Sequence, residues 1–149
     1  MEWVDRLSGQ IVGLDTAPLI YFIEKHPTYL PLVHPFFEAV ERGDIQVVTS
    51  TLTLTEVLIH PLRQGNRDLA LQYSRILLNA NHLKTLSVSP SIATEAAHLR
   101  ARHGFKTPDA IQIASAQHGN ATFFLTNDEA LTGTFGLQTL VLKHLLVHP

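Results

Sequence analysis

The chain has 149 residues, 45% of them hydrophobic and 16% charged, with a formal net charge of −2 and no cysteine. This composition excludes a disordered chain, a disulfide scaffold, a thiolate zinc site and a globally basic nucleic-acid binder. No stretch is apolar over the roughly 20 residues that a membrane span needs, and residues 1–10 lack the apolar core of a signal peptide. We therefore expect one domain over residues 1–149, located in the cytoplasm and without a membrane segment.

Short apolar runs alternate along the chain with longer segments of helical spacing. Strands are expected at 11–15, 45–50, 83–89, 121–128 and 137–142. Helices are expected at 18–26, 32–44, 51–62, 67–81, 90–104 and 107–120, with a turn or short helix over 128–136. Because apolar strands that alternate with helices form parallel sheets covered on both faces, the pattern predicts an α/β/α sandwich with a mostly parallel sheet of about five strands.

A few residues predict local features of this arrangement. Gly43 and Gly104 mark the ends of two helices, where a left-handed residue is common. Pro61 is expected to break or end its helix, because proline lacks the N–H that a helix interior uses. Trp3 and Leu7, four residues apart, are expected to pack in the core.

Four acidic residues occupy positions that this fold can bring together. Asp15 ends the first strand, and Asp128 ends the fourth. Glu56 lies on the helix after the second strand, and Asp109 opens the helix over 107–120. Strand ends and the starts of the following helices share one edge of a parallel sheet, which is where such sheets bind ligands. We expect the four acids to converge at that edge.

Three of these acids also have a purely structural interpretation. Asp15 can cap the helix that follows it, and Asp128 can cap the turn that follows it. Asp109, next to Pro108, can favour the helix dipole. These interpretations do not exclude a shared site.

Glu56 is harder to explain as a structural residue. It aligns with Leu52 and Ile59 in a stripe expected to face the core, and no Lys or Arg lies three or four residues away. Two carboxylates about 4 Å apart repel by roughly 4 kcal/mol at an effective dielectric near 20, so gathered acids need a cation. Oxygen ligands without His or Cys suit Mg²⁺ or Mn²⁺.

The chain also resembles a known family. LDTAPLIYFIE, TLTEVL, TPDAIQIASA and FLTND follow, in order and over nearly the whole chain, the pattern of PIN-domain ribonucleases, including VapC-like toxins of bacterial toxin–antitoxin pairs. The resemblance implies a PIN-like fold and Mg²⁺- or Mn²⁺-dependent endoribonuclease activity, in which the metal activates water to hydrolyse RNA phosphodiester bonds. It implies an RNA substrate, a homodimer and, for a toxin, an antitoxin protein as partner. The metal ligands and catalytic acids would be Asp15, Glu56, Asp109 and Asp128, with Thr126 as a supporting catalytic-site hydroxyl.

A basic cluster precedes Asp109 and has two interpretations. It comprises Arg100, Arg102, His103 and Lys106. Its cations can end a helix favourably, or they can grip phosphate groups beside the metal site.

Other functions are less well supported by the sequence. A non-catalytic PIN-like module that binds RNA or protein fits the low basicity and remains the main alternative. A receiver or haloacid-phosphatase domain needs an acidic pair at the first strand, which the DTA at 15–17 does not supply. The nine histidines form no HExxH motif, and no GxGxxG, P-loop or GxSxG sequence is present.

Overall fold

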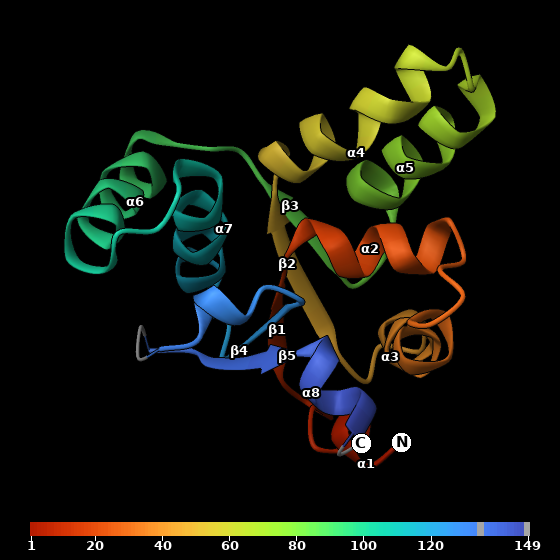
Figure 1. Ribbon diagram of the computed structural model, residues 1–149, viewed down its shortest axis with the longest axis horizontal. Coiled ribbons are helices and arrows are strands. Elements are labelled where there is room, and N and C mark those ends of the chain that lie inside the picture. The colour runs from red at the N-terminus through yellow and green to blue at the C-terminus, as the bar shows by residue number, and fades with distance from the viewer. Residues whose placement is uncertain (134–135, 148–149) are drawn as a thin grey trace.

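A five-stranded sheet organises the chain, and the computed structural model describes residues 1–133 and 136–147 (Figure 1). Neighbouring strands pair in parallel, and their spatial order is β3-β2-β1-β4-β5. The strands are β1 (Ile11–Leu14), β2 (Gln46–Ser50), β3 (Leu83–Leu86), β4 (Phe123–Thr126) and β5 (Gln138–Val141). The described strands are thus wholly parallel, and the predicted fold class is confirmed.

Helices cover both faces of this sheet. They are α1 (Glu2–Asp5), α2 (Thr16–Ile23), α3 (Leu30–Glu41), α4 (Thr51–Arg63), α5 (Arg67–Asn79), α6 (Pro90–His103), α7 (Thr107–His118) and α8 (Leu142–Val147), with a 3-10 turn η1 (Glu129–Leu131). The pair α6 and α7 packs on one face, and the remaining helices form a core on the other (Figure 1). None of the helices in the described residues has the length and apolarity to span a bilayer.

The two cores arise from the alternation of side chains along each strand. In β2, Val47 belongs to the core under α2, α3 and α5, and Val48 belongs to the core under α6 and α7. In β4, Leu125 and Phe124 divide in the same way. Apolar residues on both faces are the reason that these strands appear in the sequence as uninterrupted hydrophobic runs.

Helix α7 lies unusually close to β1. A Cβ added at Gly13 would lie 2.4 Å from Cβ of Ala116, a distance that packed side chains do not tolerate. Glycine at 13 and alanine at 116 therefore allow α7 to settle directly on the middle of the sheet. This close packing fixes α7, which carries Asp109 in its first turn.

Several sequence expectations need correction. Pro61 lies buried inside α4 without breaking it, and the helix ends at Arg63, near the expected position. The strand expected over 83–89 ends at Leu86, since Ser89 caps α6 by accepting a hydrogen bond from the Ile92 N–H at 3.2 Å. Likewise, the strand expected over 121–128 is shorter in the structure, where β4 spans only Phe123–Thr126.

Two helices were not expected, and other local predictions are confirmed. The unexpected helices are α1 and α8. Trp3 on α1 stacks on Phe36 with ring centroids 5.9 Å apart, so its predicted core position is correct. Gly43 and Gly104 follow α3 and α6 with φ of 85° and 71°. The turn or short helix expected over 128–136 contains η1, and its residues 134–135 lie outside the described chain.

Candidate functional site

Asp15 joins the ends of β1 and β4. It caps α2, its Oδ1 accepting a hydrogen bond from the Thr16 N–H at 2.8 Å. Its Oδ2 accepts a second hydrogen bond, at 2.7 Å, from the hydroxyl of Thr126. Thr126 is fully buried, and its hydroxyl accepts the N–H of Asp128 at 3.0 Å. The capping interpretation of Asp15 is therefore correct, and the same side chain also meets the predicted strand-end hydroxyl.

Asp128 also acts as a cap. It precedes η1, and its Oδ1 accepts the Ala130 N–H at 2.9 Å. A carboxylate oxygen has two lone pairs, and a single N–H occupies one of them. Asp15 and Asp128 therefore retain acceptor capacity beyond their capping bonds.

Glu56 also lies beside the start of α2, but the buried face of its helix is not the one expected from the sequence. Its Oε1 accepts a hydrogen bond of 2.7 Å from the hydroxyl of Thr16. The expected buried stripe is wrong, since Leu52 is half-buried and Ile59 is 45% exposed. Helix α4 instead buries a line one to two residues further along, namely Thr53, Val57 and Pro61. Glu56 lies at the margin of this buried line, next to the start of α2.

The pKa of Asp15 shows that the acids influence one another. Burial raises this pKa from its ordinary value, and the hydrogen bonds from Thr126 and Thr16 partly offset the rise. The negative charges of Glu56 and Asp128 raise it further. Like charges act on a pKa in this way only at short range, so these three acids lie in one electrostatic neighbourhood.

Asp109 belongs to the same neighbourhood. Burial raises its pKa to about 6, with further contributions from the charges of Asp15, Asp128 and Glu56, and Lys106 opposes the rise. No described residue donates a hydrogen bond to its carboxylate. The structure therefore brings all four predicted acids together at the carboxyl edge of the sheet.

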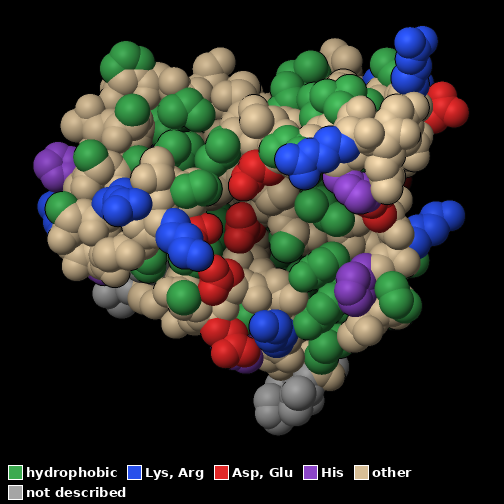
Figure 2. All heavy atoms as spheres, turned by 45° about the horizontal axis from the view of Figure 1, so that its top comes forward, with side chains coloured by type: hydrophobic (Ala, Val, Ile, Leu, Met, Phe, Trp, Pro, Cys, Tyr) green, Lys and Arg blue, Asp and Glu red, His purple; other side chains and the backbone are tan. Residues whose placement is uncertain are grey.

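Positive charge surrounds this cluster without neutralising it. None of the four carboxylates forms an ion pair with a Lys or Arg within residues 1–133 and 136–147. Figure 2 shows acidic side chains gathered near a hollow on one face of the molecule, with Lys and Arg side chains spaced around them. The charge pattern is a negative centre with a positive margin.

The donor chemistry fits a hard divalent cation. All four acids offer carboxylate oxygens, and Asp109 has both of its oxygens free of hydrogen bonds from the described chain. In that part of the chain, no three His, Cys, Asp or Glu side chains are already arranged to hold a metal ion. The site thus has the ligand types and the charge that Mg²⁺ or Mn²⁺ requires, without a preformed coordination shell.

The members of the basic cluster before Asp109 make different contacts. Arg100 donates a hydrogen bond of 2.9 Å to the Thr107 hydroxyl and so ties the end of α6 to the start of α7. Arg102 is exposed, and His103 stacks on Phe105. Lys106 is the member whose charge reaches Asp109.

Two polar residues beside the acids, Gln112 and Thr16, are not evident from the sequence as members of the site. Gln112 is 2% exposed and contacts Thr16, which in turn contacts Glu56. The available signals were a threonine directly after Asp15 and a lone glutamine within the apolar IQIASA segment. Neither feature of the sequence indicates which groups these side chains hydrogen-bond.

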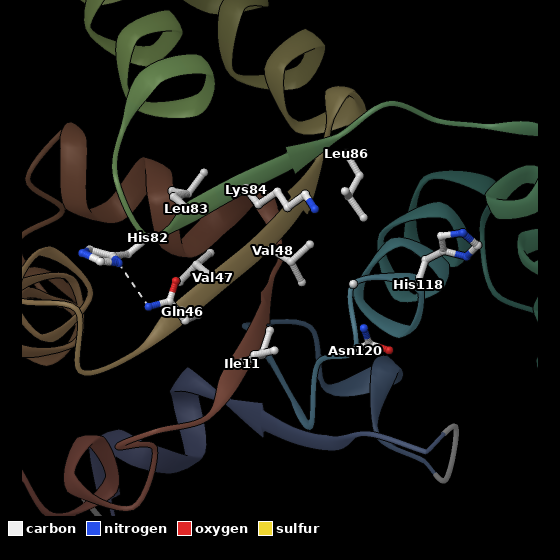
Figure 3. Close-up of a pocket in the computed structure, with 11 residues that line it drawn as sticks. Ile11, Gln46, Val47, Val48, His82, Leu83, Lys84, Leu86, His118 and Asn120 are labelled. Atoms are coloured by element: carbon white, nitrogen blue, oxygen red, sulfur yellow. Dashed lines mark hydrogen bonds between the residues drawn. The ribbon is translucent and has the colours of Figure 1, made fainter.

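A separate pocket of about 500 Å³ lies away from these acids (Figure 3). It lies over the start of β2 and over β3, beside the 3.1 Å hydrogen bond between Gln46 and His82, and it extends to His118 at the end of α7 and to Asn120 just beyond that helix. It contains no carboxylate, so its chemistry differs from that of the acidic cluster.

Comparison with known proteins supports the same fold. VapBC2 from Rickettsia felis, bound to a DNA fragment from its promoter, matches with a TM-score of 0.69 and 18% identity, over 88% of this chain and 98% of that chain. A toxin–antitoxin complex from Klebsiella pneumoniae matches with a TM-score of 0.64 and 20% identity, over 90% and 98%. VapC20 from Mycobacterium tuberculosis, a toxin that cleaves the sarcin–ricin loop, matches with a TM-score of 0.63 and 15% identity, over 76% and 86%.

Sequence comparison identifies the family. Among curated proteins, none matches the sequence at a significant level. The sequence model of the PIN domain matches residues 12–134, a range that contains all four acids and Thr126. The chain therefore belongs to the PIN-domain family.

Proposed function

We propose that this protein is an endoribonuclease that depends on Mg²⁺ or Mn²⁺ and hydrolyses phosphodiester bonds of RNA. The observation that supports this most directly is the mutual influence of Asp15, Glu56, Asp109 and Asp128 on one sheet edge, without a Lys or Arg ion pair among the described residues. We assign these four as the metal ligands and Thr126 as the hydroxyl that supports Asp15.

Each side chain has a defined part in this proposal. A bound cation would supply an activated water and neutralise the charge that develops on the phosphate. Thr126 and Thr16 hold Asp15, and Thr16 also holds Glu56, so these carboxylates have fixed orientations. Lys106 lies close enough to Asp109 to affect its pKa and is placed to meet a phosphate of the substrate.

We further propose that the protein is the toxin of a toxin–antitoxin pair, acting in the cytoplasm as a homodimer. Structures of similar fold support this role, since they include VapBC2, a toxin–antitoxin complex and a toxin that cleaves the sarcin–ricin loop. The partner would then be an antitoxin protein that blocks the acidic site. Growth arrest on expression of the wild type, and normal growth with Glu56→Gln, would support the toxin role.

A cleavage assay tests the nuclease directly. Purified protein is incubated with a structured RNA in Mn²⁺, with and without a chelator, and compared with Asp15→Asn. Asp44→Asn is a matched control, because Asp44 is an exposed acid paired with Arg42 at 3.0 Å. We expect cleavage by the wild type and the control alone, and none in chelator.

The same assay distinguishes the nuclease from the main alternative. A PIN-like module that binds RNA or protein without cutting is consistent with the net charge of −2. Such a module would bind RNA in a gel-shift assay but leave it intact at every Mn²⁺ concentration, and Asp15→Asn would not change binding. That outcome would overturn the nuclease proposal.

A further inference from the structure

Gln112 is a long polar side chain buried in the centre of the molecule. It lies on α7 one helical turn after Asp109 and is 2% exposed. A buried amide without hydrogen-bond partners is costly, so such groups are almost always satisfied. Its partners come from three other segments, which are the end of β2, the start of α2 and the first turn of α4.

The orientation of the Gln112 amide follows from Ser50. The Ser50 hydroxyl oxygen accepts the Leu52 N–H at 3.2 Å, and the hydroxyl donates to Oε1 of Gln112 at 3.0 Å. Oε1 is therefore the acceptor in this pair, and Nε2 points the other way. Because an amide nitrogen only donates, every contact of Nε2 has a fixed direction.

One chain of hydrogen bonds runs from this nitrogen to Glu56. Nε2 donates to the hydroxyl oxygen of Thr16 at 3.3 Å. Thr16 has a single hydroxyl hydrogen, and it is donated to Oε1 of Glu56 at 2.7 Å. The carboxylate of Glu56 can only accept, so Thr16 is the donor to it, and Gln112 occupies a lone pair of the same hydroxyl oxygen and so holds the Thr16 side chain in this orientation.

A second chain runs from the same nitrogen to the segment before Asp15. Nε2 donates to Thr53, whose hydroxyl lies 2.9 Å from that of Thr49. Thr49 donates its hydrogen to the carbonyl of Leu14 at 3.1 Å, so Thr53 must be the donor to Thr49. The chain ends on the residue that directly precedes Asp15. One amide therefore connects the segments that carry Asp15, Glu56 and Asp109.

We propose that Gln112 is a positioning residue that orients Glu56 through Thr16 and fixes the spacing of the acid-bearing segments. The inference rests on the proposed function in one respect, namely that these acids hold a divalent cation. A residue needed only to fill the core could be replaced by an apolar side chain of similar length, which would leave the orientation of Glu56 unchanged. The positioning role requires the amide itself.

The test compares Gln112→Met with Ser115→Ala. Ser115 is a matched control on the same helix, because it is fully buried and its hydroxyl donates to its own helix, to the carbonyl of Ile111. Two quantities are measured for each variant: the affinity for Mn²⁺ by calorimetry, and the side-chain carboxyl ¹³C resonance of Glu56 in metal-free protein. For Gln112→Met we expect an affinity about 10- to 100-fold weaker and a shifted Glu56 resonance. For Ser115→Ala we expect both to stay at wild-type values.

A double variant tests whether the effect passes through Thr16. Thr16→Val removes the last link, so adding Gln112→Met should weaken Mn²⁺ binding little further. If Gln112→Met does not fold, Gln112→Asn takes its place, since it keeps a buried amide but shortens its reach toward Thr16. A Glu56 resonance unchanged in the folded variants, or independent effects of the two substitutions, would overturn the proposal.

A failure of the proposed function gives a different result from a failure of the Gln112 proposal. A wild-type protein that neither binds Mn²⁺ nor cleaves RNA contradicts the metal-dependent nuclease. The Glu56 resonance in metal-free Gln112→Met and Ser115→Ala still decides whether Gln112 positions that carboxylate.

Discussion

The hydroxyl of Thr126 donates a 2.7 Å hydrogen bond to the carboxylate of Asp15, although the two residues are 111 positions apart in the chain. The sheet register explains this contact. Leu14 of β1 pairs in parallel with Leu125 of β4, so the next residue of each strand follows at the same height. The positions of the acid and the hydroxyl are thus set by two paired strands in the middle of the sheet rather than by a loop.

The first prediction concerns this contact. Thr126→Val should lower the free energy of unfolding by about 1 to 3 kcal/mol, because the Asp15 carboxylate and the Asp128 N–H each lose a buried partner. It should also raise the pKa of Asp15, which the Thr126 hydrogen bond now lowers. Urea unfolding and ¹³C titration of Asp15 measure the two effects. Thr126→Ser, which keeps the hydroxyl, should leave the pKa of Asp15 near its wild-type value; a rise there as well would contradict the assignment.

The second prediction is that Mn²⁺ or Mg²⁺ stabilises the fold. A cation that binds only the folded protein at 100 times its dissociation constant adds about 2.7 kcal/mol, which raises Tm by several degrees. Asp128→Asn should lose most of this increase, whereas Asp44→Asn, an exposed acid away from the site, should keep it. Melting curves with metal and with chelator provide the measurement. An equal shift in both variants would point to nonspecific binding.

The third prediction concerns the packing that places α7. Gly13→Ala should destabilise the protein by about 1 to 3 kcal/mol, because the new Cβ would lie 2.4 Å from Ala116 Cβ and 3.0 Å from the Phe124 ring. Ala116→Gly in the same chain removes the closer of these contacts and should recover part of the loss. Urea unfolding of the two single variants and the double variant gives the coupling. Strictly additive effects would show that the two residues do not compete for the same space.

The central features of the fold could be predicted from sequence because they depend on local patterns. Apolar runs such as 123–125 indicate burial on both faces of a strand, and Asp15 and Asp128 end the strands predicted at 11–15 and 121–128. Since the carboxyl ends of parallel strands and the starts of the following helices share one edge, convergence of the acids was predictable from the expected positions of strands and helices. The lateral order of the strands was not, because no local pattern records which strand lies beside which.

Other features depend on contacts that a sequence pattern does not contain. The buried line of α4 passes through Thr53 and Val57 rather than Leu52, since the neighbouring elements, not the hydrophobicity of α4, decide which side is covered. Helix α8 begins directly after β5, where Leu142 and Leu145 have the same apolar character as a strand. The partners of Gln112 come from three distant segments, so its role becomes visible only in the folded chain.

The fourth prediction separates two cations of the basic cluster. Lys106 affects the pKa of Asp109, whereas Arg102 is exposed on the last turn of α6. Lys106→Glu should weaken RNA binding across sequences and reduce the slope of log affinity against log salt by roughly one unit, the effect of losing one phosphate contact. Arg102→Glu serves as the matched charge reversal and should have a smaller effect on both. Equal effects would mean that only overall charge matters.

The last prediction concerns the pH dependence that Asp109 imposes. The pKa of Asp109 is raised from 3.8 to about 6, so the unfolded chain gives up this proton at a lower pH than the folded protein does. The contribution of Asp109 to stability therefore falls as pH rises from about 4 to about 6, and then remains level. The loss should be about 1 to 2 kcal/mol, less than the full shift implies, because the carboxylate is partly exposed to solvent.

Asp109→Asn should remove the part of the pH dependence that Asp109 contributes. With chelator present at pH 7, the variant should be as stable as the wild type or more stable, while Mn²⁺ affinity and RNA cleavage collapse with the loss of a hard ligand. If Asp109 only favours the dipole of α7, the same substitution should instead cost about 0.3 to 1 kcal/mol and leave cleavage intact. Asp68→Asn is the matched control, since Asp68 is an exposed acid in the first turn of α5 and tests the dipole effect alone. Urea unfolding of both variants between pH 4 and pH 7, followed by cleavage in Mn²⁺, decides between the two roles. A less stable Asp109→Asn that cleaves at the wild-type rate would remove Asp109 from the metal site and leave Asp15, Glu56 and Asp128 as its remaining candidates.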